Sequence, residues 1–76
     1  MTLDYCSPNR SYVVENITGT AETCRHLYNL GITEGSLLTC VFTAPSGDPI
    51  AFDVQGTLIA FRKQQLKQII VKPEAM

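Results

Sequence analysis

Thiols offer this chain its widest range of chemistry, because a cysteine can be oxidised, bind a soft metal or act as a nucleophile. The chain has three, Cys6, Cys24 and Cys40, and no C-x-x-C pair of the kind found in metal and redox motifs. The N-terminal residues lack the basic start and apolar centre of a secretion signal. We therefore expect a cytoplasmic protein with reduced thiols, in which Cys24 and Cys40 serve as small core residues.

The remaining reactive side chains do not form a recognisable catalytic set. His26, the single histidine, lies two positions from Cys24, so on a helix the two side chains point to different sides and cannot share a metal ion. No Ser–His–Asp set or Gly-rich phosphate loop can be assembled. Asp48 and Asp53 flank an apolar stretch, where Asp48 is expected to hydrogen-bond its own turn. The sequence predicts neither an enzyme nor a metal site or cofactor.

The charge balance disfavours nucleic acid as a partner. The formal net charge is −1, whereas contact with phosphates requires a basic surface. Basic residues gather toward the C-terminus, which indicates one basic edge, either a solvated face or a docking edge for an acidic partner. The longest apolar run, residues 58–61, is far shorter than the roughly 20 residues of a membrane-spanning helix, so we expect no membrane insertion.

Residues 20–36 predict a short helix with a defined stop, around which the other elements are arranged. Thr20 can cap the helix over residues 21–30, and Gly31 supplies the positive φ that ends many helices. Ile32 should then fold back onto Leu27. The apolar spacing predicts an inward face. Its members are Ala21, Cys24, Leu27 and Tyr28, with Arg25, His26 and Asn29 on the opposite side.

Strand patterns occupy most of the other residues. Residues 11–18 predict a first strand with Val13 and Ile17 on the core face, and residues 36–44 predict a second with Leu38 and Cys40 on one side. Residues 50–54 alternate with a period of two. A two-residue turn at 55–56 would then place large apolar side chains opposite one another across a hairpin.

A single helical turn at 62–67 and a final strand at 68–72 complete the order. Five short strands in so short a chain predict a mainly β fold, a small closed or nearly closed barrel with one short α-helix between strands one and two. We expect a barrel domain over residues 11–72. Residues 1–10 should form an N-terminal arm whose Leu3 or Tyr5 packs against the barrel, and residues 73–76 a loose tail.

The sequence pattern leaves two positions open for Phe42, buried or exposed. Strict alternation places it in the core, which is the expected position, whereas a bulge would expose it beside Pro45 as an apolar patch suited to a protein contact.

Several segments in order resemble the FeoA family, ferrous iron transport protein A. The resemblance covers residues 11–72 and departs from the family pattern at Phe61 and Cys24. Its segments are Leu30-Gly31, Gly35, Gly47-Asp48-Pro49, Ala60-Phe61-Arg62 and Ile69-Ile70-Val71.

This resemblance implies a five-stranded SH3-like barrel and a cytoplasmic accessory of ferrous iron uptake that binds the cytoplasmic part of the FeoB membrane GTPase transporter. The expected contact surface is the helix and the loop at 44–49. Its residues are Arg25, His26, Leu27, Phe42, Pro45 and Asp48. The alternative is a free-standing module that binds a transition metal or serves regulation, like the C-terminal barrel of metal-dependent transcription regulators.

Overall fold

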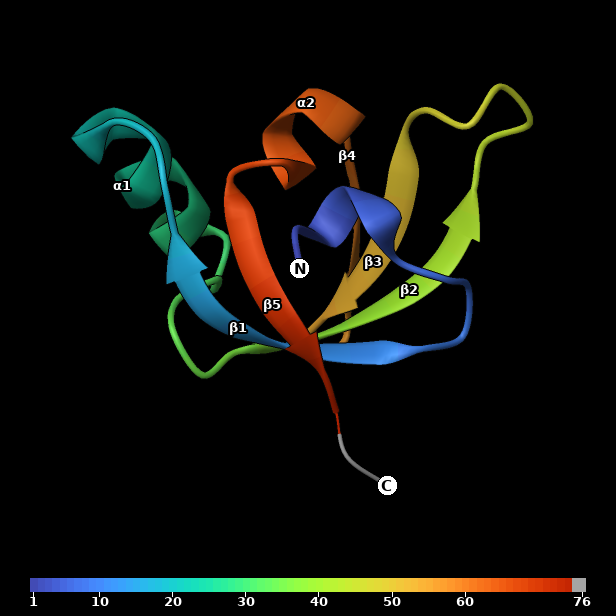
Figure 1. Cartoon of the computed structure of the whole chain (residues 1–76), viewed down its shortest axis with the longest axis horizontal. Helices are drawn as coiled ribbons and strands as arrows, with labels where there is room; N and C mark the ends of the chain where they lie inside the picture. Colours follow the sequence, from blue (N-terminus) through green and yellow to red (C-terminus); the bar gives the residue numbers. More distant parts are fainter. Residues whose placement is uncertain (75–76) are drawn as a thin grey trace.

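Five antiparallel strands form one curled sheet in the order β4-β3-β2-β1-β5. In this computed structural model, which describes residues 1–74, the strands are β1 (Ser11–Ile17), β2 (Leu37–Thr43), β3 (Ile50–Val54), β4 (Thr57–Phe61) and β5 (Ile69–Pro73). The helices are the 3₁₀ turn η1 (Leu3–Tyr5), α1 (Ala21–Asn29) and α2 (Lys63–Leu66). Figure 1 shows α1 beyond the end of β1 and α2 above the sheet. The prediction of a mainly β fold with one helix between the first two strands is confirmed.

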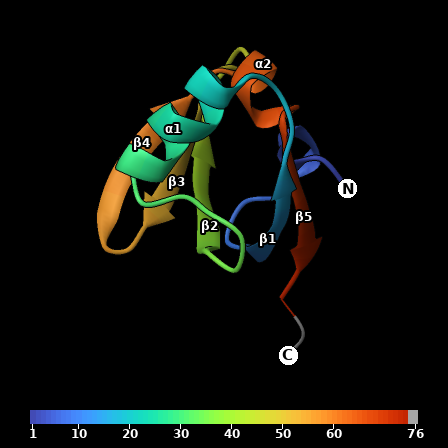
Figure 2. The same ribbon diagram turned by 90° about the vertical axis from the view of Figure 1, so that its left-hand side faces the viewer.

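The curl of the sheet encloses the core. Figure 2 shows β3 and β4 on one side, β1 and β5 on the other, and β2 between them. The buried apolar side chains come from every strand and from both ends of the chain. The largest that are fully buried include Phe52, Leu3, Leu27, Ile32, Leu38, Leu66 and Ile69. Within residues 1–74, no helix has the length and apolar character needed to cross a membrane.

The β3–β4 hairpin follows the sequence prediction in every pair. Gln55 (φ 52°) and Gly56 (φ 86°) make the two-residue turn, the left-handed conformation that suits the twist of a tight hairpin. Phe52 therefore lies opposite Ile59, and Ile50 opposite Phe61. The Phe52 and Phe61 rings also pack together with centroids 6.2 Å apart.

The predicted core face of β1 is wrong at Val13 but confirmed at Ile17, and a bulge explains the difference. Tyr12 and Val14 are buried, while Val13 is only partly covered. The register with β5 shifts between Val14 and Asn16, so the intervening Glu15 is an extra residue that reverses the alternation. Ile17 then turns back toward the core, against which it packs.

A second bulge corrects the expected position of Phe42. In the β2–β3 ladder Cys40 pairs with Phe52, but Phe42 pairs with Ala51, which leaves Val41 as the extra residue. Without the bulge Phe42 would point inward like Leu38 and Cys40. With it, 53% of the Phe42 side chain is exposed, so the expectation of a buried Phe42 is wrong.

Helix α1 begins and ends as its sequence predicts. The Thr20 hydroxyl accepts a hydrogen bond from the Thr23 amide at 3.1 Å. At the other end, the Ile32 amide donates to the Leu27 carbonyl and the Gly31 amide to that of Tyr28, the two bonds of a Schellman stop. Gly31 adopts φ 89°, which returns Ile32 to the core beside Leu27.

The inward face predicted for α1 is largely wrong. Leu27 is the only residue of the helix that is fully buried, Cys24 is half-buried, and Ala21 and Tyr28 are exposed. The Schellman stop draws the last turn onto the core. Leu27 is therefore the main anchor of the helix on the core.

Residues 1–10 are integrated with the sheet. The Met1 ammonium group and the Val71 amide exchange hydrogen bonds with each other's carbonyl oxygens, and Thr2 bridges to Ile70. Leu3 is fully buried, whereas Tyr5 is 76% exposed, so Leu3 is the residue that packs against the barrel.

Candidate partner-binding surface

Helix α1 presents polar and aromatic side chains to solvent on both sides of its anchor. Arg25, His26 and Tyr28 are all exposed, and Tyr28 is 68% exposed. Leu27, between them in sequence, has only 2% of its surface exposed, so it anchors the helix and leaves little of itself for a partner. Two hollows flank the helix, one on each side of this anchor.

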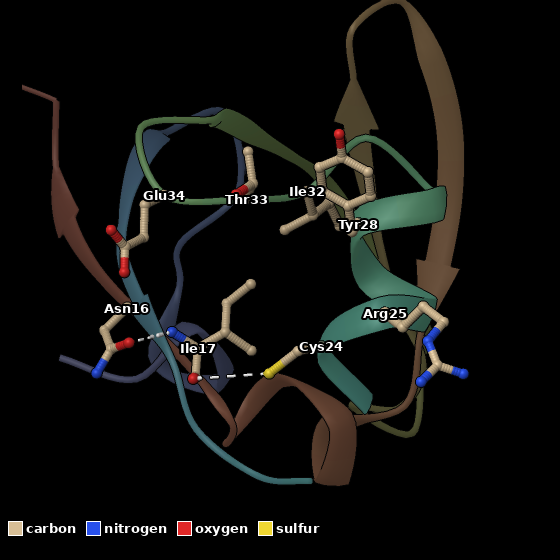
Figure 3. Close-up of a pocket in the computed structure, with 8 residues that line it drawn as sticks. All are labelled: Asn16, Ile17, Cys24, Arg25, Tyr28, Ile32, Thr33 and Glu34. Atoms are coloured by element: carbon tan, nitrogen blue, oxygen red, sulfur yellow. Dashed lines mark hydrogen bonds between the residues drawn. The ribbon is translucent and has the colours of Figure 1, made fainter. Parts of the chain in front are cut away.

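The larger hollow, of about 370 Å³, lies between α1, β1 and the loop that follows the helix. Figure 3 shows its lining, which consists of Asn16, Ile17, Cys24, Arg25, Tyr28, Ile32, Thr33 and Glu34. The guanidinium of Arg25 points away from the hollow, and Glu34 lies across it on the opposite rim. The hollow therefore combines an apolar floor with an aromatic ring and an acidic edge, and the Arg25 cation lies outside it.

The loop at 31–36 forms a fixed wall of this hollow. The Ser36 hydroxyl accepts from the Thr33 amide at 2.9 Å and donates to the Gly31 carbonyl at 3.2 Å. The Gly35 amide donates to the Val14 carbonyl at 2.8 Å, and the Val14 amide donates to the Ser36 carbonyl at 2.9 Å. Because these bonds close the loop and tie it to β1, the hollow is preformed.

The smaller hollow, of about 290 Å³, lies between α1 and the segment that carries α2. It is lined by Thr20, Glu22, Thr23, His26, Leu27, Gln65 and Gln68. Two hydroxyl and two amide side chains are among these residues, so this side of α1 offers hydrogen-bonding groups beside apolar surface. Arg25 and His26 thus face different hollows on opposite sides of one helix.

Phe42 and Pro45 belong to a separate surface. Both are exposed, at the end of β2 and in the loop that follows it. Figure 1 shows this loop and α1 on opposite sides of the molecule, with α2 between them. The structure therefore divides the six expected contact residues into a group on α1 and a group at the β2–β3 loop.

The hydrogen-bond partner predicted for the Asp48 carboxylate is wrong. Its carboxylate accepts a hydrogen bond from the Lys63 amide at 3.0 Å, across the chain and not within its own turn. Lys63 is the first residue of α2, where free amides and the helix dipole favour a carboxylate. Asp48 thus fastens the β2–β3 loop to α2.

Metal-ligating residues do not gather on either surface. Within the part of the chain that the structure describes, no three His, Cys, Asp or Glu side chains are placed to hold a metal ion. Cys24 contacts the Ile17 carbonyl at 3.9 Å in the larger hollow, and His26 lies outside it.

Comparison with known proteins decides the family. The family model described as the FeoA domain matches residues 1–73 of the chain. The chain belongs to the FeoA family. The match extends over the N-terminal residues that the sequence resemblance left out, in keeping with their integration into the sheet. No curated protein sequence matches the chain.

Solved FeoA structures share the fold. An FeoA protein from Chlorobium tepidum has a TM-score of 0.90 and 28% identity, over 99% of this chain and 71% of that one. An FeoA-like protein from Clostridium acetobutylicum also has a TM-score of 0.90, with 26% identity over 100% and 88% of the two chains. Stenotrophomonas maltophilia FeoA, solved with zinc and described as a prokaryotic SH3 domain protein, has a TM-score of 0.81 and 29% identity over 95% and 89%. The predicted SH3-like fold is confirmed.

Of the eight residues that line the larger hollow, the sequence predicted only Arg25 as a contact residue. Tyr28 was assigned to the core, and neither Thr33 nor Glu34 was considered for a binding role. The segment Thr33-Glu34-Gly35-Ser36 does carry a signal, since two hydroxyl residues three positions apart around a glycine favour a closed turn.

Proposed function

We propose that this FeoA-family protein is a non-catalytic accessory of ferrous iron uptake that binds the cytoplasmic part of an FeoB-type membrane GTPase transporter. The protein acts in the cytoplasm, and the exposed face of α1 makes the contact. The observation that carries the proposal is the exposure of Arg25 and Tyr28 on the rim of a preformed hollow, on a helix anchored by Leu27.

The chemistry of the α1 surface favours a protein partner. The hollow has room for one or two side chains, Tyr28 offers a rigid amphipathic ring, and Arg25 offers a planar cation; both residue types are enriched at binding hot spots. The opposite charges of Arg25, outside the hollow, and of Glu34, on its rim, would orient a partner of mixed charge. The Stenotrophomonas relative is described as a candidate activating factor of bacterial ferrous iron transport, which supports the same assignment here.

Binding of the transporter's purified cytoplasmic domain, measured by calorimetry, tests the proposal. The Arg25→Ala/Tyr28→Ala double variant is expected to bind at least about tenfold more weakly, because hot-spot truncations cost about 1–2 kcal/mol or more each. Both side chains are exposed, so the variant should fold normally.

Phe42→Ser supplies the matched control, since it removes an exposed aromatic side chain far from α1. It is expected to bind as the wild type does. Weakening by Phe42→Ser alone would move the contact to the β2–β3 loop. Failure of the wild-type protein to bind the domain, with or without a guanine nucleotide, would overturn the proposed function.

A further inference from the structure

Two of the three cysteines meet although they are far apart in sequence. The Sγ atoms of Cys6 and Cys40 lie 3.5 Å apart, across a separation of 34 residues. Both thiols are free, as is Cys24. Cys40 is fully buried in β2, whereas Cys6, just after η1, is half-buried. The pair thus joins a partly exposed cysteine to a buried one.

The main chain holds this pair in place. The Asn9 amide donates to the Cys40 carbonyl at 2.7 Å, and the Cys40 amide donates to the Arg10 carbonyl at 2.9 Å. The Cys6 amide donates to the carbonyl of Leu3, whose side chain is fully buried, so the other end of the segment is also anchored. A disulfide has an S–S length of about 2.05 Å, so the sulfurs need to approach by about 1.5 Å, a shift within reach of side-chain rotation.

We propose that Cys6 and Cys40 form a reversible disulfide, with a low-molecular-weight disulfide such as oxidised glutathione as the oxidant. The Cys6 thiolate attacks one sulfur of the oxidant and forms a mixed disulfide, and the first thiol leaves. The Cys40 thiolate then attacks the Cys6 sulfur, the protein S–S bond forms, and the second thiol leaves. The two leaving thiolates take up the two protons lost by the protein, so one disulfide is reduced as another is made.

The environment makes this reaction slow at neutral pH. Burial, and after it the neighbouring Cys40 thiol, raise the pKa of Cys6 from 9.0 to about 12. The thiolate is the attacking species, so the rate should rise about tenfold for each unit of pH below that pKa. The pair should therefore oxidise slowly at neutral pH and faster as the pH rises.

Oxidation of the purified, reduced full chain by oxidised glutathione tests the proposal, followed by thiol counting in denaturant and intact mass. The wild type should keep one of its three thiols, lose about 2 Da, and yield a peptide linking Cys6 to Cys40. Excess thiol should reverse the change. Cys24→Ser is the matched control and should form the same link with no thiol left.

Two further variants separate the steps. Cys40→Ala should trap the mixed disulfide on Cys6, because the resolving thiol is absent. Cys6→Ser should leave the buried Cys40 unmodified. The proposal is overturned if the wild type ends as a glutathione adduct of Cys6 or as a disulfide-linked dimer. It is also overturned if the folded chain never forms the Cys6–Cys40 link on prolonged incubation with the oxidant at raised pH, where the Cys6 thiolate is more abundant.

Discussion

Leu27→Ala should be the most damaging change in α1, although the neighbouring Tyr28 is the larger side chain. Leu27 has 2% of its surface exposed and packs with the core, so its truncation removes buried apolar contact and leaves a cavity. Such changes cost about 2–5 kcal/mol. Leu27 also lines the smaller hollow, into which the site can relax, so we expect about 2–3 kcal/mol. Tyr28→Ala removes a side chain that is 68% exposed and should cost less than about 0.5 kcal/mol.

Urea denaturation of the three proteins measures both effects. A domain of this size has a total stability of roughly 4–11 kcal/mol, so Leu27→Ala should remove a large share of it and lower the midpoint of thermal unfolding by about 10–20 °C. A Leu27→Ala protein that is too unstable to fold would also support the predicted loss of stability. Equal losses for the two variants would contradict the account, because they would mean that Tyr28 is buried as the helical spacing alone predicts.

The remaining predictions concern single hydrogen bonds and one thiol. Thr20→Ala should cost about 1 kcal/mol in urea denaturation by removing the helix cap on the Thr23 amide, and Thr20→Ser should restore it; no loss in the alanine variant would contradict the cap. Asp48→Ala should cost about 1 kcal/mol because the Lys63 amide loses its acceptor, whereas Asp48→Asn, which retains an oxygen, should cost less; equal costs would refute this. Because the pKa of Cys6 is raised from 9.0 to about 12 in the folded chain, the Cys6 thiol ionises only in the unfolded chain between these two values. As the pH rises from about 8 to about 10.5 under reducing conditions, the wild type should therefore lose more stability than Cys6→Ser.

Much of the fold could be predicted from signals in short stretches of the sequence. The Gln55–Gly56 turn fixed the register of its hairpin because a two-residue loop leaves only one set of facing residues. The end of α1 at Gly31 was equally predictable, because the residue just past a helix end often has a positive φ and is then usually glycine. Both depend on residues adjacent in sequence, which is why propensity arguments succeed there.

The errors arose where distant contacts decide orientation. A bulge inserts one residue into a strand, and neither Glu15 nor Val41 carries a residue-level signal for it. Each bulge reverses the face on which the later residues of its strand lie, and this reversal exposes Phe42. The spacing of Tyr28 along the helix is that of a core residue. Tyr28 is exposed because α1 contacts the barrel mainly through Leu27, and tertiary packing, not helical spacing, decides this. The contact surface expected on α1 and the β2–β3 loop stays a prediction, and it did not include the hollow beside the helix.

Uptake of radiolabelled ferrous iron by cells that lack this protein tests the central claim most directly. Cells supplied with the wild-type protein or with Phe42→Ser should regain uptake, whereas cells with Arg25→Ala/Tyr28→Ala, expressed at an equal level, should not. Uptake that is unchanged by loss of the protein, or fully restored by the α1 double variant, would contradict a role in ferrous iron transport exerted through the face of α1.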